Sequence, residues 1–97
     1  MAATYVILLN YTEQGVKNFK NTPERIKAVE QQMAQAGGRF VSYYLTMGAY
    51  DAITVAEFPD DATAAKTLLS IAAAGNVRTT SMRAFTREEA ESIARSL

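Results

Sequence analysis

The chain has 97 residues, and its ten basic and ten acidic side chains cancel to a formal net charge of zero. This length favours one domain with a single hydrophobic core, and the charge balance argues against nucleic-acid or membrane-surface binding. The sequence contains no cysteine and no histidine, which excludes disulfides, thiol and imidazole nucleophiles and nearly all zinc and copper sites. No apolar run approaches the roughly 20 residues of a membrane span, and the N-terminal residues lack a secretory pattern. We therefore expect a cytoplasmic protein without a metal or another cofactor.

The first expected element is a strand at 4–9, in which both alternating sets of side chains are apolar. This pattern is typical of a strand in the middle of a sheet that is covered on both faces. The segment 10–21 that follows is long for a strand-to-helix connection, and Thr12 is suited to cap one short helical turn within it. Long loops of this kind often bind ligands, and a plain surface loop anchored by Phe19 is the alternative.

Two helices are expected at 22–36 and 62–74. The first begins with Thr22 as its N-cap, directly before a proline, and the second follows the cap residues Asp60 and Asp61. Apolar residues at helical spacing predict the side of each helix that faces the core. For the first helix these residues are Ile26, Val29, Met33 and Ala36. For the second helix they are Ala62, Ala65, Leu68, Leu69 and Ala72.

A β-hairpin is expected between the two helices, with strands at 39–46 and 50–58 folded back at Gly48 and Ala49. Glycine at the first central position suits a type II′ turn, because that position requires a positive φ. This turn fixes the register and sorts the side chains onto two faces. The predicted pairs on one face are Leu45 with Ala52, Tyr43 with Thr54, and Val41 with Ala56. The pairs on the other are Thr46 with Asp51, Tyr44 with Ile53, Ser42 with Val55, and Phe40 with Glu57.

The last strand is expected at 77–85, and both of its faces are half polar, which is typical of an edge strand. A capping box of Thr86 and Glu89 then opens a terminal helix. The apolar side of this helix consists of Ala90, Ile93, Ala94 and Leu97. No linker or repeat separates these elements, so we expect residues 1–97 to form a single domain.

The order of the elements, βαββαβ followed by a helix, predicts a ferredoxin-like α+β fold with an antiparallel four-stranded sheet. In that fold the strand order is 4-1-3-2, and both crossover helices lie on one face. The other face would leave apolar side chains of the strand 4–9 uncovered, and a large exposed apolar patch is unusual on a monomer. We therefore expect two copies to pack face to face as a homodimer. The alternative is that the terminal helix folds over the sheet of its own chain.

Several short stretches, spread over nearly the whole chain, are similar to the motifs of a known family. They are Tyr5, Asn10, the Thr-Glu-Gln-Gly stretch at 12–15, the hairpin 46–51 with its Gly-x-Tyr-Asp segment, and the stretch 75–79. Together they resemble the GYD-domain family of small bacterial proteins. This resemblance implies a dimeric α/β barrel and no established activity. The hairpin alone resembles, more weakly, the effector-binding domains of leucine-responsive-type regulators, which share the fold and bind small molecules between subunits.

The candidate site residues gather mainly around the hairpin. Asp51 follows the turn and shares a mixed polar and apolar face with Tyr44 and Thr46, where a carboxylate would act as a base or bind a ligand. The alternative is that this carboxylate holds the hairpin through hydrogen bonds or pairs with an arginine. Arg83 would bind an anionic substrate or form a solvated or intersubunit ion pair. The full set of ligand-binding candidates is Asp51, Tyr50, Tyr44, Thr46, Asn10, Thr12 and Arg83, and no catalytic residue is assigned.

Three classes of function remain open. The favoured one is a domain that binds or senses a small molecule, with its pocket between sheet and helices or at the dimer interface. The second is a cofactor-independent enzyme of the monooxygenase or isomerase type, an analogy that rests on fold alone. The third is an interaction or assembly module without a ligand. The first two predict an apolar cavity with a few polar groups, whereas the third predicts a filled core.

Overall fold

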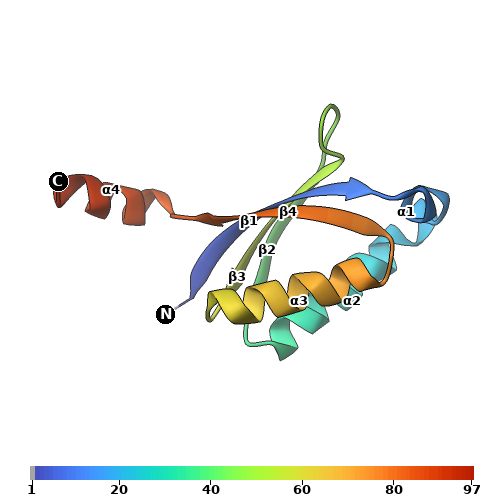
Figure 1. Ribbon diagram of the computed structural model, residues 1–97, viewed down its shortest axis with the longest axis horizontal. Coiled ribbons are helices and arrows are strands. Elements are labelled where there is room, and N and C mark those ends of the chain that lie inside the picture. Colours follow the sequence, from blue (N-terminus) through green and yellow to red (C-terminus); the bar gives the residue numbers. More distant parts are fainter. Residues whose placement is uncertain (1) are drawn as a thin grey trace.

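The structure is a computed structural model that describes residues 2–97 and contains one antiparallel sheet (Figure 1). Four strands, β1 (Ala3–Tyr11), β2 (Arg39–Leu45), β3 (Ala52–Phe58) and β4 (Val77–Ala84), form this sheet in the order β2-β3-β1-β4. The order is the one expected from the sequence, with β1 and β3 in the middle and β4 at an edge. The ferredoxin-like α+β fold is therefore confirmed.

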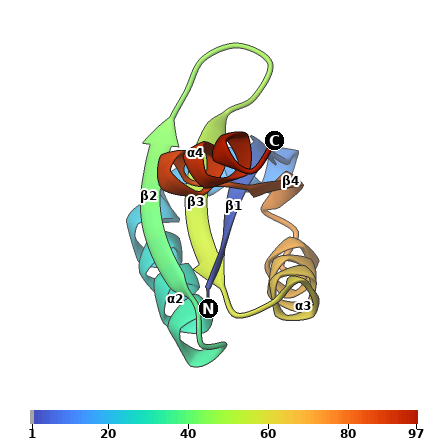
Figure 2. The same ribbon diagram turned by 90° about the vertical axis from the view of Figure 1, so that its left-hand side faces the viewer.

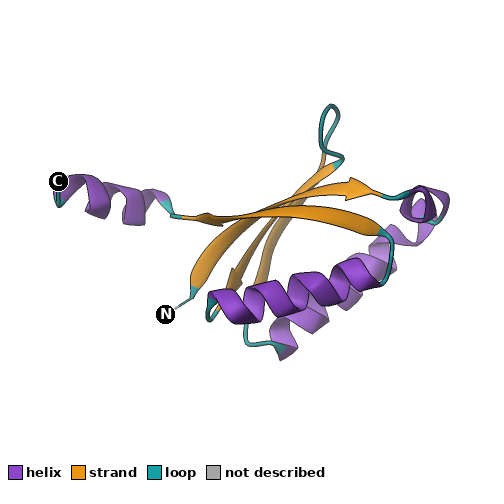
Figure 3. Cartoon of the chain, viewed as in Figure 1, coloured by secondary structure: helices purple, strands orange, loops and turns teal. Residues whose placement is uncertain are grey.

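Two helices, α2 (Thr22–Gln35) and α3 (Asp61–Ala73), cross over the sheet and lie on the same face of it (Figures 1 and 3). The start of α3 is as predicted, because a carboxylate oxygen of Asp60 accepts a hydrogen bond from the backbone N–H of Thr63 at 2.7 Å. The predicted N-cap of α2 is wrong by one residue. Asn21 is the cap and makes no side-chain bond there, while Thr22 is already helical and is buried.

Three shorter elements complete the chain: α1 (Glu13–Lys17), the 3₁₀ helix η1 (Phe19–Asn21) and α4 (Arg87–Arg95). Thr12 caps α1, as the sequence predicted. The capping box of Thr86 and Glu89 that opens α4 is also confirmed. Within residues 2–97, no helix has both the length and the hydrophobicity required to cross a membrane.

The core-facing side of α3 differs from the predicted one. Its buried residues are Ala64, Thr67 and Leu68. Leu69, which we expected to face inward, is 71% exposed, and Ala62 and Ala65 are exposed as well. Alanine is present on every side of this helix, so the apolar pattern has no single phase, and the contact with the sheet decides which residues are buried.

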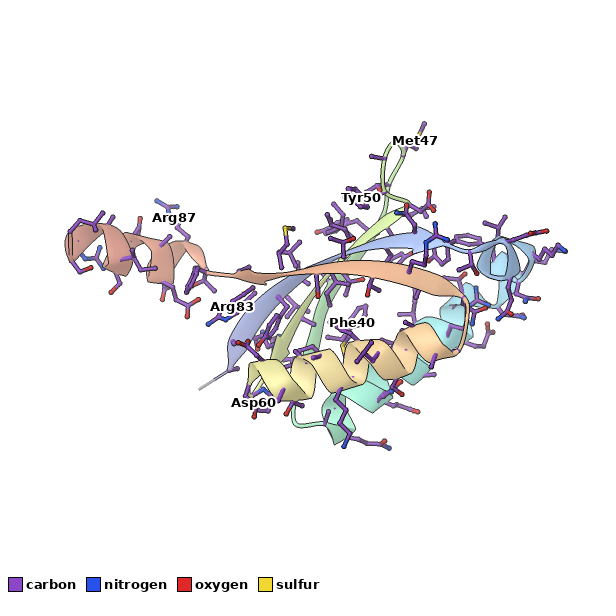
Figure 4. The ribbon with its side chains drawn as sticks, in the orientation of Figure 1. Phe40, Met47, Tyr50, Asp60, Arg83 and Arg87 are labelled. Carbon is purple, nitrogen blue, oxygen red and sulfur yellow. The ribbon has the colours of Figure 1, made fainter. Side chains whose placement is uncertain are left out.

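The hairpin register is as predicted near the turn and wrong at the open end. The confirmed pairs are Leu45 with Ala52, Tyr44 with Ile53, Tyr43 with Thr54, and Ser42 with Val55. A β-bulge at Val41 then shifts β2 by one residue, so that Phe40 pairs with Ala56 and Arg39 with Glu57. The bulge places Phe40 on the helix side of the sheet, where it packs against the core (Figure 4). The sequence did not predict this bulge, because one extra residue in a strand does not clearly interrupt the alternation of polar and apolar side chains.

The connection of the hairpin, residues 46–51, is longer than the predicted two-residue turn, because strand pairing ends at Leu45 and Ala52. Gly48 has a φ of 117°, which agrees with the predicted need for a positive φ. The tip projects beyond the sheet on the side away from α2 and α3, and Met47 at its end is 99% exposed (Figure 4).

The hydrophobic core lies between the sheet and the helices α2 and α3. Its largest fully buried side chains are Phe58, Ile7 and Met33. The ring of Tyr5 meets that of Phe58 edge-on, with 5.7 Å between the centroids. The Tyr5 hydroxyl donates a hydrogen bond to a carboxylate oxygen of Asp61 at the start of α3, which ties β1 to that helix. Burial and this bond raise the pKa of Tyr5 to about 12.

The other side of the sheet, which we call the open face, is covered by no helix among residues 2–97 (Figures 1 and 2). Strand pairing places on it the side chains of Val6, Leu8, Tyr44, Ile53, Val55 and Met82. The terminal helix α4 extends away from the end of β4 and has no buried residue (Figure 3). The alternative in which α4 covers its own sheet is therefore wrong.

The chain exposes more surface than a globular protein of its size. Its accessible surface is 6484 Å², whereas the usual scaling with mass gives about 5,500 Å² for 10.6 kDa. Its radius of gyration is 14.2 Å, against about 12.5 Å for a compact domain of this length. The excess of about 1,000 Å² is close to the ~800 Å² that each partner contributes to a standard interface.

Candidate functional site

Three of the residues predicted for a site, Thr46, Tyr50 and Asp51, lie in the hairpin tip. Asp51 is fixed by three hydrogen bonds: its side chain accepts one from the backbone N–H of Tyr11 at 2.9 Å, its own N–H donates to Leu9, and its carbonyl accepts from Thr46. The Thr46 hydroxyl donates to the carbonyl of Tyr50 at 2.6 Å. The carboxylate of Asp51 therefore ties the hairpin to the end of β1.

The remaining candidates do not form one cluster with Asp51. Tyr44 is 64% exposed on the open face, and Asn10 pairs with Arg78 on β4. Arg83 pairs with Tyr5 at the opposite end of β1, where its guanidinium lies 4.8 Å from the ring centroid of Phe85. Figure 4 shows Arg83 at the other end of the sheet from the hairpin tip. The structure therefore separates Arg83 from the other candidates.

The last candidate, Thr12, belongs to a contact between α1 and the turn before β4. Its N–H donates to the carbonyl of Asn76 at 3.0 Å, and its hydroxyl donates to the carbonyl of Gly75 at 2.6 Å. The Gln14 side chain donates to the Asn76 side chain at 3.0 Å. A Cβ on Gly15 would lie 2.0 Å from the Asn76 carbonyl oxygen, so only glycine fits this close approach.

A cleft of about 270 Å³ opens between the sheet and the helices α2 and α3. We call this space the cleft. Its wall is mainly apolar and includes Ile7, Leu9, Val29, Met33, Leu68 and Ile71. The two helices diverge over it (Figure 2), and a hydrogen bond of 2.9 Å from the Gln32 side chain to the Ser70 hydroxyl joins them. Both of these residues also line the cleft.

Four polar side chains of the cleft wall, those of Tyr11, Thr22, Arg25 and Tyr43, interact with one another. The hydroxyls of Tyr11 and Tyr43 are hydrogen-bonded to each other at 2.7 Å. Burial, followed by this bond, raises the pKa of Tyr11, while the positive charge of Arg25 opposes the rise. Arg25 and Thr22 line the cleft too, and a guanidinium nitrogen of Arg25 donates to the Thr22 hydroxyl at 3.3 Å. The cleft therefore combines an apolar body with a small polar group of residues.

The polar residues of the cleft were not among the predicted site residues. The predicted register already placed Tyr43 opposite Thr54 on the helix side, and this was the available signal. By sequence these positions resemble ordinary core, because strand alternation indicates the face of a residue and not whether the helix opposite leaves a space. Tyr11 and Arg25 lie outside the hairpin, and only the fold brings them to Tyr43. Within the described residues, no three Asp or Glu side chains come together as a metal site.

Comparison with known proteins gives two matches. A family model described as "GYD domain" matches residues 5–94. A protein of Thermus thermophilus, named "Glutamine synthetase and cystathionine beta-lyase binding protein", is 37% identical over 83 residues, which cover 84% of this chain and 87% of that protein. The stretches 12–15 and 75–76 and the hairpin 46–51, on which the resemblance to this family was based, lie in the hairpin tip and in the contact of α1 with the turn before β4.

The contact at Gly15 can be tested by Gly15→Ala. Alanine has a higher helix propensity than glycine, so the change in helix propensity alone would stabilise the protein. The added methyl must instead displace the backbone at Asn76, and we expect a loss of about 2–3 kcal/mol in the free energy of unfolding, measured by urea denaturation. Val16→Ala, at a neighbouring residue that is 62% exposed, is the control and should change stability by less than about 0.5 kcal/mol. Equal stability of Gly15→Ala and wild type would contradict the contact.

Proposed function

Because the chain belongs to the GYD domain family, we propose that it is a binding protein whose cleft takes one small, largely apolar molecule. The observation that carries this proposal is the cleft itself, a space of about 270 Å³ that the chain leaves between its sheet and its helices. For comparison, an apolar cavity of roughly 150 Å³ is enough to hold benzene. The cleft supports this proposal over an assembly module without a ligand, for which the sequence predicts a filled core.

Binding is better supported than catalysis. The Asp51 carboxylate is engaged by the backbone of Tyr11 and does not line the cleft. The raised pKa of Tyr11 keeps its hydroxyl protonated at neutral pH, so it is suited to hydrogen bonding and not to acting as a base. The cofactor-independent enzyme remains the alternative on the same fold.

The cleft can be tested with 1-octanol as a neutral probe in an NMR titration. We expect shifts at the side chains of Met33, Leu68 and Ile71. Ala28→Trp, at an exposed position that lines the mouth of the cleft, should fill the entrance and weaken binding at least fivefold. Ala34→Trp is the matched control, because Ala34 is exposed on the same helix and does not line the cleft. Equal weakening by both variants, or no shifts in the wild type, would refute the proposed site.

A homodimer through the open face is the second part of the proposal. The open face carries the apolar side chains of Val6, Leu8, Ile53, Val55 and Met82, and no helix among residues 2–97 covers it. The surface excess of about 1,000 Å² also matches one side of a standard interface. The terminal helix α4 supports the same arrangement. It projects beyond its own sheet with Ile93 47% exposed and Leu97 fully exposed, so it would lie against the second copy.

Light scattering at micromolar concentration tests the dimer. We expect the mass of two chains for the wild type. Met82→Lys should raise the dissociation constant at least tenfold, because a two-fold axis would bury two unpaired charges in the interface. Leu69→Lys is the control, since Leu69 is an exposed apolar residue on the outer side of α3, with 71% exposure against 46% for Met82. A monomeric mass for the wild type would contradict the homodimer.

Binding to another protein is a second candidate function, and the name of the Thermus relative favours it. The hairpin tip offers a suitable surface, because Leu45 is 60% and Met47 is 99% exposed. Apolar side chains of this exposure are costly in water and often anchor protein interfaces. In this reading the tip contacts the partner protein, while the open face joins the two copies.

The partner hypothesis can be examined by co-elution of the purified chain with glutamine synthetase and with cystathionine beta-lyase. Met47→Asp should abolish any complex, because it puts a charge into the apolar contact. Val16→Asp, at an exposed apolar position on α1, should leave the complex intact. If neither enzyme co-elutes with the wild type, the enzymes in the relative's name are not partners of this chain.

A further inference from the structure

The polar group in the cleft has donors that the chain itself does not use. The Tyr11 and Tyr43 hydroxyls share one hydrogen bond, which occupies one of their two protons. No other hydrogen bond of either hydroxyl occurs within residues 2–97, so the second proton is available to a molecule in the cleft. A neutral alcohol, an amide or an anion would each accept it.

Arg25 lines the same cleft, and its positive charge acts on the Tyr11 hydroxyl. Its guanidinium donates only to the Gly15 carbonyl at 3.4 Å and to the Thr22 hydroxyl at 3.3 Å, and both distances exceed the usual range for N–H···O bonds. Among the described residues, no carboxylate lies within 4.0 Å of Arg25. By contrast, the exposed Arg39 is held by both carboxylate oxygens of Glu57. The charge of Arg25 therefore lacks a counter-ion at a site that faces the cleft.

The rest of the cleft wall favours a ligand with an apolar body and one small charged end. Most of it is apolar, as at Ile7, Met33 and Ile71, and the Gln32 and Ser70 side chains are hydrogen-bonded to each other. A sugar or a nucleotide would therefore lose most of its hydrogen bonds there. One guanidinium and one free hydroxyl proton match the single charge and the planar pair of oxygens of a carboxylate, whereas a phosphate dianion needs more donors.

We propose that the ligand of the cleft is a small apolar monocarboxylic acid, with its carboxylate on Arg25 and the Tyr11–Tyr43 hydroxyl pair. This inference rests on the proposed function, because it names the ligand class of the same cleft. The apolar part of the acid lies between the sheet and the helices α2 and α3. A body of about eight to ten carbon and oxygen atoms fits a space somewhat larger than a benzene-sized cavity.

The test compares acids with the corresponding alcohols by titration calorimetry at neutral pH. One pair, octanoate and 1-octanol, has a flexible apolar part. The other pair, 3-phenylpropanoate and 3-phenylpropanol, has a more rigid one. We expect at least one acid to bind about tenfold or more tightly than its alcohol, as a charge-assisted hydrogen bond would require. Arg25→Gln should remove this preference, because it weakens binding of the acid much more than binding of the alcohol. Lys27→Gln, which removes an equal charge from an exposed position on α2, should preserve it.

Tyr43→Phe provides a second variant that keeps the ring and removes one hydroxyl. It should reduce the preference for the acid about threefold or more, and thermal denaturation checks that both variants fold. If the alcohols bind as tightly as the acids, the cleft site stands and the carboxylate inference fails. If none of the four molecules binds to the wild type, the proposed function fails and this inference fails with it.

Discussion

The need to bury both sides of one small sheet is the constraint on which the rest of this structure depends. β1 and β3 lie in the middle of the sheet and carry apolar side chains on both faces. The crossover helices α2 and α3 cover one face, and this contact forms the core around Ile7, Met33 and Phe58. The second face needs another layer. Since α4 points away from it, a second copy of the chain is the layer that we propose.

The covered face is itself filled unevenly. α2 packs mainly against β2 and α3 mainly against β4, so the helices diverge over the middle of the sheet (Figure 2). At one end of β1, Tyr5 packs against Phe58 within a closed core. Towards the other end, at Tyr11, the space between the helices is not filled. The same sheet and helices thus supply a rigid core and, beside it, a cleft, which suits a binding protein because the walls are held by the core.

The residues on which the family resemblance was based have structural roles. Asp51 fixes the hairpin to β1, and Thr12, Gln14 and Gly15 join α1 to the turn at Asn76. These contacts hold the end of β1 from which the Tyr11 hydroxyl reaches Tyr43. A change in one of these residues would therefore alter the polar part of the cleft, although none of Asp51, Gln14 and Gly15 lines it.

The sequence by itself determined the order of the elements, the strand order, the caps Thr12, Asp60 and Thr86, and the excess of apolar side chains on β1, because each depends on local spacing or on composition. Only the tertiary structure decided which side of the alanine-rich α3 faces the sheet, and where β2 bulges at Val41, since neither leaves a unique local pattern. The tertiary structure also decided that a cleft forms and which residues line it. Arg25, Tyr11 and Tyr43 come from three separate elements, and the space between them depends on the angle between two helices, which no spacing along the chain records.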